Sequence, residues 1–219
     1  MAKKALLIGI NRYKIPGADL RGCVNDVKNV RSVLIQYYRF PSRDIKVVTD
    51  FLATKKTMQS EIGKLLKGAK PGDVLLLHYS GHGSNVPDKN GDEADHRDEI
   101  LCPTDLDWKD PLLDDWLRTT FDPLPAGVNF TVIMDCCHSG SNTRAIQPPD
   151  VKSIERYLPS PWDLVAAESD RRLRGTVRGT RAALEKTAKR SKDVVTVNIP
   201  ELLLTGCRAT QTSADAYIG

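Results

Sequence analysis

The sequence has 219 residues, 40% of them hydrophobic, which is enough for one domain with a sizeable buried core. Its formal net charge of +4 is too small to indicate a nucleic-acid-binding protein, and no apolar run approaches the length of a membrane span. The five cysteines, two of them adjacent, do not form the pattern of a disulfide framework and favour a reducing compartment such as the cytoplasm.

The first apolar run, Ala5–Ile10, follows a short basic N-terminus and superficially imitates a signal peptide. It is only six residues long and lacks a small-residue cleavage pattern, so it predicts a buried strand. Continuous apolar runs at Ile45–Thr49, Val74–Tyr79 and Phe130–Met134 predict three more buried parallel strands, and Leu202–Leu204 predicts a fifth.

Helical patterns separate these predicted strands. One apolar stripe runs from Val27 to Tyr37, and another runs from Met58 to Leu66. Strand alternating with helix predicts a doubly wound α/β fold, in which a mostly parallel sheet is flanked by helices as a three-layer sandwich.

Two stretches interrupt this alternation. Residues 84–111 are polar, acidic and rich in Asp, Asn, Gly and Pro, and they predict a loop beyond the third strand. Residues 141–198 become basic and helix-prone from about Pro161 to Lys192, and they predict a surface excursion or linker. The acidic stretch is consistent with a cation site and the basic stretch with a polyanion contact. A solvated surface is the equally weighted alternative for both.

Two motifs follow the third and fourth predicted strands, at the edge where ligands gather in such sheets. The first is His78-Tyr79-Ser80-Gly81-His82-Gly83-Ser84, and the second is Asp135-Cys136-Cys137-His138-Ser139-Gly140. If the strands are neighbours, a histidine and a cysteine converge, as thiol nucleophilic catalysis requires. The backbone N–H groups of Gly83 and Cys137 are then candidates for an oxyanion hole. The alternative is a loop histidine at His82 and a small core residue at Cys137.

The two motifs, with Cys137 55 positions after His82, resemble the signature pair of the metacaspases and the prokaryotic orthocaspases, which are caspase-like cysteine peptidases. The resemblance spans most of the chain and is specific. It also includes residues 5–13, 20–27, 91–99 and 211–216. A caspase-like fold and a cysteine endopeptidase activity are what this resemblance implies.

The resemblance also implies roles for individual residues. It makes Cys137 the nucleophile in preference to Cys136, and His82 the base. The residues that resemble the lining of the pocket for the side chain before the cut (the S1 pocket) are Cys23, Asp26, Ser80 and Asp135. Two carboxylates in a recessed pocket suit Arg or Lys and disfavour an acidic side chain. Taken alone, Asp26 has an alternative interpretation as a helix N-terminal residue favoured by the macrodipole, but the matched motif around it favours the pocket.

Calcium is a further expectation, as an activator and not for the chemistry. Asp98, Asp114 and Asp115 match calcium ligands of calcium-activated metacaspases, but Arg144 stands where the family usually supplies another carboxylate. An EF-hand is excluded because Glu93 replaces the glycine of the loop. A zinc site is excluded because the histidines and cysteines lack paired ligand spacing.

The resemblance divides the single domain 1–219 into three parts. Residues 1–140 resemble a large subunit with the His/Cys dyad, 141–198 form the basic linker, and 199–219 resemble the start of a small subunit that ends early. Family members often cut their own chain, and the basic stretch from Asp170 to Lys192 offers many Arg and Lys sites in an expected exposed segment. A permanent basic surface helix is the alternative for this stretch.

The leading hypothesis is an endopeptidase that cuts polypeptides after Arg or Lys, possesses no nucleic-acid or membrane partner, and is a monomer. The second hypothesis is a catalytically inactive caspase-like domain that serves regulated interaction. A third, a flavodoxin-like ligand-binding module, lacks support because no glycine-rich phosphate loop is present.

Overall fold

The carboxyl ends of the parallel strands form one edge of the central sheet, and the motifs with His82 and Cys137 follow the strands at that edge. A computed structural model describes residues 1–89, 91, 96–137, 153–165, 168, 201–205 and 214–216. Its main sheet has five parallel strands in the order β2-β1-β3-β7-β9. Their bounds are β1 Lys3–Gly9, β2 Ile45–Thr49, β3 Val74–Ser80, β7 Asn129–Asp135 and β9 Glu201–Thr205.

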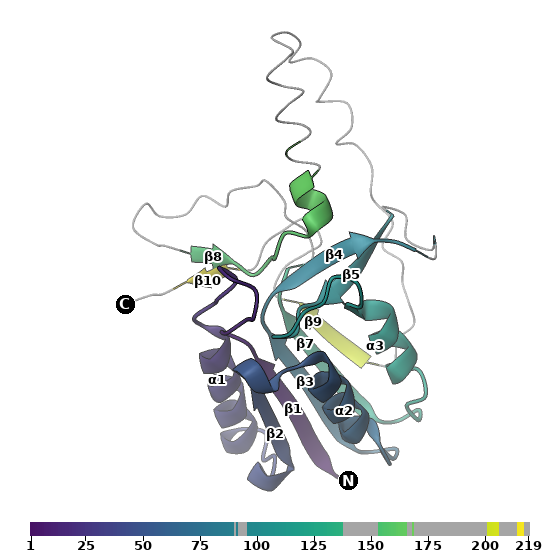
Figure 1. The fold of residues 1–219 in the computed structure, drawn as a ribbon. Helices are drawn as coiled ribbons and strands as arrows, with labels where there is room; N and C mark the ends of the chain where they lie inside the picture. Colours follow the sequence, from purple (N-terminus) through teal and green to yellow (C-terminus); the bar gives the residue numbers. More distant parts are fainter. Residues whose placement is uncertain are drawn as a thin grey trace, which may run out of the picture.

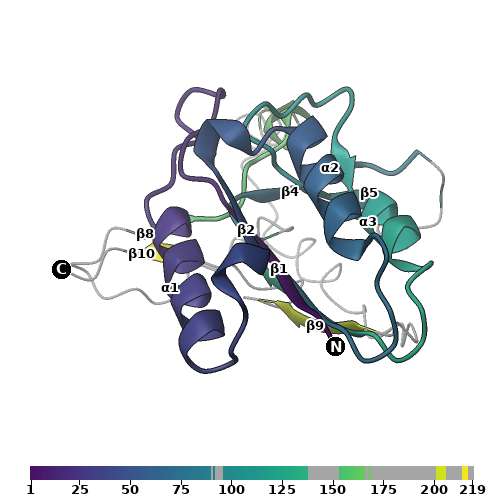
Figure 2. The same cartoon turned by 90° about the horizontal axis from the view of Figure 1, so that it is seen from below.

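Helices cover both faces of this sheet, which confirms the predicted three-layer α/β class (Figures 1 and 2). Helix α1 (Cys23–Gln36) packs Val27 and Leu34 on one face, whereas α2 (Lys55–Leu66) and α3 (Asp114–Phe121) share the larger core on the other. Short 3-10 turns, η1 (Ser42–Asp44) and η2 (Asp50–Leu52), flank β2. No helix in the described part of the chain is long and apolar enough to cross a membrane.

The chain does not form the simple loop that was predicted for residues 84–111. Strands β4 (Gly83–Pro87), β5 (Arg97–Leu101) and β6 (Leu112–Leu113) pair as a small antiparallel sheet beyond β3. The prediction was wrong because the first three residues of β4, Gly83, Ser84 and Asn85, are small or polar and give no strand signal. Their burial comes from segments distant in sequence, and Ser84 is fully buried.

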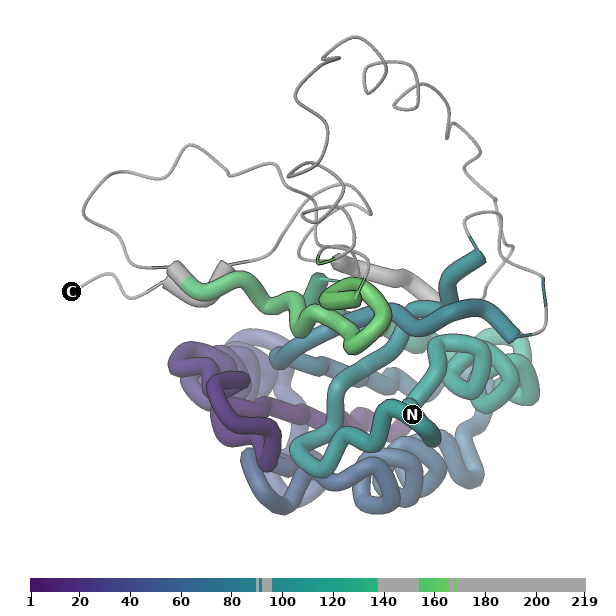
Figure 3. The backbone as a smooth tube through the Cα atoms, turned by 45° about the horizontal axis from the view of Figure 1, so that its top comes forward, coloured from purple at the N-terminus to yellow at the C-terminus, as the bar shows by residue number. Residues whose placement is uncertain are grey.

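Residues 153–165 cross the carboxyl edge of the main sheet (Figure 3). They begin with β8 (Ser153–Glu155), which pairs antiparallel with β10 (Ala214–Ala216), and end in a helical turn at 161–165. This part of the expected linker therefore packs against the sheet edge.

The register brings the strand ends level. Gly9 of β1 pairs with Ser80 of β3, which pairs with Asp135 of β7. A Cβ on Gly9 would lie 2.6 Å from the carbonyl oxygen of Cys23, so glycine lets α1 approach β1 closely. The first turn of α1, which contains Asp26, is thereby held beside the ends of β1 and β3.

Candidate active site

The loop that carries His82 is held by two buried tyrosines. The backbone N–H of His82 donates to the Tyr13 hydroxyl at 2.8 Å, and the His82 carbonyl accepts from the Tyr79 hydroxyl at 2.7 Å. A Cβ on Gly81 would lie 2.7 and 2.8 Å from these two hydroxyl oxygens, so only glycine fits there. The loop is fixed by hydrogen bonds on both sides of the imidazole and is not free to move as an isolated turn.

The His82 ring has a defined tautomer. Its Nε2 lies 2.8 Å from the carbonyl oxygen of Ala18, and both residues are buried. Because a carbonyl oxygen can only accept, Nε2 must carry a proton. In the neutral ring Nδ1 is therefore the basic nitrogen, which is the state that a general base needs.

Cys137 is the second residue after β7, and its surroundings differ from those of Cys136. Both Cys136 and Cys137 are buried thiols. Cys136 belongs to the large hydrophobic core beneath α2 and α3, whereas Cys137 belongs to neither hydrophobic cluster. The backbone N–H of Cys137 points instead toward the segment at 153–158.

Two backbone N–H groups converge on one carbonyl oxygen. Gly83 donates to the Arg156 carbonyl at 2.9 Å, and Cys137 donates to the same oxygen at 3.2 Å. A pair of donors on one carbonyl oxygen is the arrangement that stabilises a developing oxyanion during acyl transfer. The loops after β3 and β7, which the strand pairing makes neighbours, thus meet at the Arg156 peptide group.

The side chain of Arg156 enters the space between the strand ends and α1. Its Nη1 donates to Ser80 Oγ at 2.8 Å and pairs with the Asp135 carboxylate, while Nη2 donates to Asp26 Oδ2 at 2.8 Å. The side chain of Arg156 is 5% exposed, whereas those of Asp26 and Asp135 are 32% and 30% exposed. Ser80 Oγ donates in turn to Asp26 at 2.8 Å, so the acceptors form one connected pocket.

Burial opposes the charge on Arg156, but the neighbouring groups outweigh it. The Cys23 sulfur and the carboxylates of Asp135 and Asp26 together raise the pKa of the guanidinium above its ordinary value. The pocket is therefore built for a cation. Among the described residues, the structure brings together all four residues that were predicted to line the S1 pocket: Cys23, Asp26, Ser80 and Asp135.

His78 lies near the base of this pocket and was not predicted to belong to it. Burial lowers the pKa of His78, partly offset by Asp135 and Asp26. A neutral imidazole in this place leaves the two carboxylates available to the guanidinium.

Arg156 lies at a bend between β8 and the bridge at Tyr157, and the main chain is held on both sides of it. Before Arg156, Glu155 pairs with Ala214 of β10. After Arg156, the Leu158 N–H donates to the Gly83 carbonyl at 3.0 Å. The segment is therefore fixed by β10 before Arg156 and by Gly83 after it.

Comparison with known proteins identifies a family for this chain. The model for "Metacaspase, peptidase C14 domain" matches residues 3–145. This chain belongs to the metacaspase family. Metacaspase-1 of Coccidioides immitis is 37% identical over 99% of this chain and 51% of the relative, and Metacaspase-1A of Aspergillus oryzae is 36% identical over 99% and 56%. The chain spans about half the length of the curated relatives it matches.

A solved structure shows a similar fold. Protein GSU0716 from Geobacter sulfurreducens superposes with a TM-score of 0.67 at 26% sequence identity, over 98% of this metacaspase and 76% of the other chain. The predicted family and fold class are thus both confirmed.

The expected calcium ligands of this metacaspase lie on β5 and α3. Asp98 is buried on β5, and Asp114 and Asp115 form the first turn of α3, where Asp115 pairs with Arg118. Within the described part of the chain, no three acidic, histidine or cysteine side chains are grouped so as to hold a metal. Arg144 lies outside the described residues, and calcium activation stays a prediction.

Arg156, Ala18 and the paired tyrosines are the site residues that sequence reasoning missed. Tyr13 and Tyr79 fall inside motifs that were recognised, but nothing in the pattern distinguishes their hydroxyls from those of other tyrosines. Arg156 is one of many basic residues in the predicted linker. Its only sequence signal is that it is the residue type that an acidic pocket accepts.

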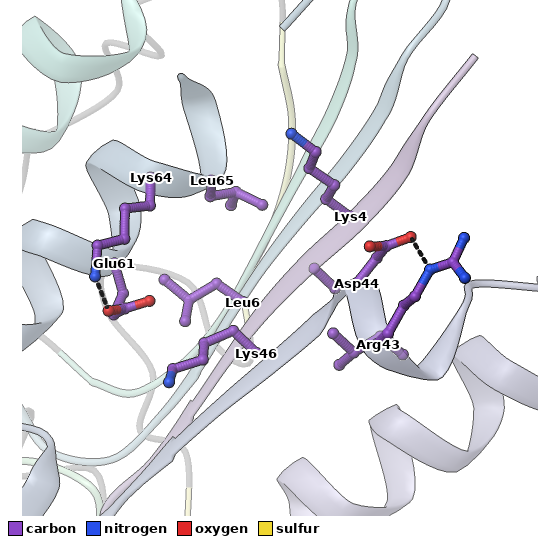
Figure 4. A pocket seen from close by; sticks show the side chains of 10 residues that line it. Lys4, Leu6, Arg43, Asp44, Lys46, Glu61, Lys64 and Leu65 are labelled. Carbon is purple, nitrogen blue, oxygen red and sulfur yellow. Dashed lines mark hydrogen bonds and ion pairs between the residues drawn. The ribbon is translucent and has the colours of Figure 1, made fainter. Parts of the chain in front are cut away.

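A separate surface pocket of about 200 Å³ lies at the opposite, amino-terminal side of the sheet (Figure 4). Its lining is basic with two ion pairs, Lys64 with Glu61 at 2.6 Å and Arg43 with Asp44 at 3.9 Å. It lies away from the His82 and Cys137 loops, and we assign it no part in the chemistry.

Proposed function

We propose that this metacaspase is a cysteine endopeptidase that cleaves polypeptides after Arg or Lys, with an acyl-enzyme at Cys137. The observation that supports the proposal most is the position of Arg156. Its carbonyl oxygen accepts from Gly83 and Cys137 while its guanidinium contacts Asp26, Ser80 and Asp135. A residue before a cleaved bond needs both of these contacts at once.

In the proposed mechanism, Nδ1 of His82 accepts the Cys137 proton, and the thiolate attacks the substrate carbonyl carbon. The N–H groups of Gly83 and Cys137 stabilise the oxyanion. His82 then protonates the leaving amine as the peptide bond breaks, which leaves a thioester. Water, deprotonated by His82, hydrolyses the thioester and regenerates the thiol. This chemistry requires no metal, and calcium enters the proposal only as an activator.

The specificity follows from the charge of the pocket. Two carboxylates and a hydroxyl complement the planar fork of an arginine and also suit an ammonium group. A substrate aspartate would bring a third carboxylate to the same place without a cation to pair with it. Cleavage after Asp, as in true caspases, is therefore not expected.

Fluorogenic peptides that end in Arg, Lys or Asp test this proposal, each with calcium and with a chelator. Wild type is compared with Cys137→Ala and His82→Ala, and Cys136→Ala is the matched control because it removes the adjacent thiol. Arg or Lys turnover that is lost in the first two variants and kept in the control supports the proposal. A calcium requirement would show as turnover that the chelator abolishes.

The second candidate is an inactive interaction domain of the same fold. Correctly folded wild type that turns over none of the peptides, with or without calcium, would favour it. Circular dichroism and thermal unfolding of each variant distinguish a missing activity from a missing fold.

The proposal includes self-processing, a monomeric state and a reducing, cytoplasmic location, without nucleic-acid or membrane partners. The predicted self-processing stretch at 170–192 lies outside the described residues. The four described cysteines are buried thiols, which supports a reducing compartment. Light scattering after gel filtration tests the monomer, and fractionation of cells that express the protein tests the location.

A further inference from the structure

We infer that residues 153–163 are a built-in substrate mimic that fills the active site, and that the Arg156–Tyr157 bond is the chain's own cleavage site. The inference rests on the proposed peptidase function and adds a regulation of the same site. It assigns the cut to a bond outside the basic stretch 170–192 predicted from the sequence.

The main-chain contacts of the segment lie on both sides of one peptide bond. On the amino side, β8 pairs with β10 from Ser153 to Glu155. On the carboxyl side, Tyr157 forms a parallel bridge with Gly83, whose N–H and carbonyl contact residues 156 and 158. The carbonyl that receives two N–H donors stands between them, so the bond after Arg156 occupies the reactive position.

The side-chain contacts make the same assignment independently. A buried arginine needs hydrogen-bond acceptors for its guanidinium, but it does not need its carbonyl oxygen to accept from two N–H groups. Arg156 does so while its guanidinium satisfies Asp26, Ser80 and Asp135 in a nearly closed pocket. A substrate arginine would need the same acceptors, so substrate and Arg156 cannot bind together.

A second anchor holds the segment beyond the bond. We call it the Asp163 cluster: Asn85, Arg97, Tyr157, Ser160 and Asp163. Asp163 accepts from Arg97 Nη1 and from the Tyr157 hydroxyl, both at 2.6 Å. Arg97 also donates to Asn85 of β4, which ties the cluster to the small antiparallel sheet.

The Asp163 cluster is also the start of the helical turn at 161–165. Ser160 N–H donates to Asp163 Oδ2 at 3.1 Å, and Asp163 N–H donates to Ser160 Oγ at 3.3 Å. This reciprocal pair is a capping box, which fixes the chain direction immediately after the bond. Residues 157–163 are therefore anchored without any contribution from Arg156. A cut after Arg156 would release only the residues before the bond.

The cleavage step balances with water as the sole co-reactant. The Cys137 thiolate attacks the Arg156 carbonyl carbon, the bond to the Tyr157 nitrogen breaks, and that nitrogen takes the proton held by His82. Water then hydrolyses the thioester, giving a carboxylate on Arg156 and an amine on Tyr157. The products are residues 1–156 and 157–219.

The test compares wild type with Arg156→Ala and Arg156→Lys, with Cys137→Ala as the uncleavable control. Arg43→Ala is a matched control, because Arg43 is also paired with an aspartate but lies at the other side of the sheet. Intact mass over time locates the cut. Alkylation of Cys137 by iodoacetamide, mapped by mass spectrometry, reports access to the thiol without requiring turnover.

We expect wild type and Arg43→Ala to give fragments that end at Arg156 and begin at Tyr157, and Cys137→Ala to stay intact. Uncut wild type should alkylate at least tenfold more slowly than Arg156→Ala, and Arg156→Lys should fall between them. Arg156→Ala should cleave Arg peptides from the first minute, whereas wild type should show a lag.

Equal alkylation of uncut wild type and Arg156→Ala, with no cut after Arg156, would overturn the inference even if Arg peptides are cleaved. A cut confined to 170–192 would overturn the assigned bond. If no variant cleaves any peptide, the proposed function fails, and the self-cleavage that rests on it fails too. The alkylation rates then still decide whether the segment covers Cys137. If Arg156→Ala does not fold, the comparison of wild type with Arg156→Lys decides instead.

Discussion

The carboxylate of Asp26 offers a quantitative test of the pocket. We consider Asp26→Asn in an Arg156→Ala background, so that the variant affects only the binding of an added peptide and not the competition by Arg156. In the structure Asp26 accepts one hydrogen bond from the guanidinium at 2.8 Å. The same contact is expected for a substrate arginine in the pocket.

The expected magnitude follows from the type of contact. A hydrogen bond to a charged group contributes roughly 1.5–3 kcal/mol. The lower half of that range applies because Asp26 is 32% exposed and water replaces part of the contact. A loss of about 1.5–2 kcal/mol corresponds to about a 10–30-fold decrease in kcat/KM for an Arg peptide. Most of the decrease should be in KM, because the contact is present in both the bound substrate and the transition state.

The assay is steady-state hydrolysis of Arg and Lys peptides. Asp44→Asn is the matched control, since Asp44 is 37% exposed, pairs with an arginine and lies before β2 at the opposite end of the strands. It should change kcat/KM less than twofold. An unchanged kcat/KM in Asp26→Asn, or an equal decrease in the control, would refute the assignment of Asp26 to the substrate pocket.

Three further predictions concern the Asp163 cluster, the loop that carries His82 and the pH dependence of stability. Tyr157→Phe removes one hydrogen bond to Asp163 and should shorten the lag of wild-type turnover several-fold; an unchanged lag would count against the Asp163 cluster as an anchor. Gly81→Ala should abolish peptide turnover and lower Tm, because its Cβ would lie under 3 Å from two hydroxyl oxygens; normal turnover would show that the loop adjusts. Because the pKa of His78 is lowered in the fold, the unfolded chain binds the proton first as pH falls below about 6.5. The free energy of unfolding should then decrease by at most about 1.4 kcal/mol per pH unit, and His78→Gln should flatten this slope in urea titrations.

The parallel strands were predictable because each is a continuous apolar run buried on both faces. The run at Ile45–Thr49 matches β2 residue for residue, and the run at Val74–Tyr79 is one residue shorter than β3. The motifs that end β3 and β7 could be placed together for the same reason, since the structure pairs these strands. Asp26 was open to two interpretations; it lies in the first turn of α1 and also contacts Arg156, and its role toward substrate stays a prediction.

The remainder depends on contacts between distant parts of the chain. Arg156 is 130 residues from Asp26 in sequence, and no local pattern indicates that the two meet. Strand β4 was missed because Ser84 and Asn85 are polar and become buried only through β5 and the segment around Leu158. Sequence periodicity reports which side chains are buried by their own element, and it does not report burial that a distant segment provides.

The position of Arg156 also determines the kinetic order of the first cut. A molecule whose active site holds its own residues 153–163 cannot accept a second molecule as substrate. The first cut after Arg156 must therefore be unimolecular. Its half-life should be the same in dilute and in concentrated solution. Once some copies have opened, they can attack exposed segments of others, and the later phase should accelerate with concentration. A dilution series would therefore show a constant initial rate per molecule followed by a phase that disappears as the protein is diluted.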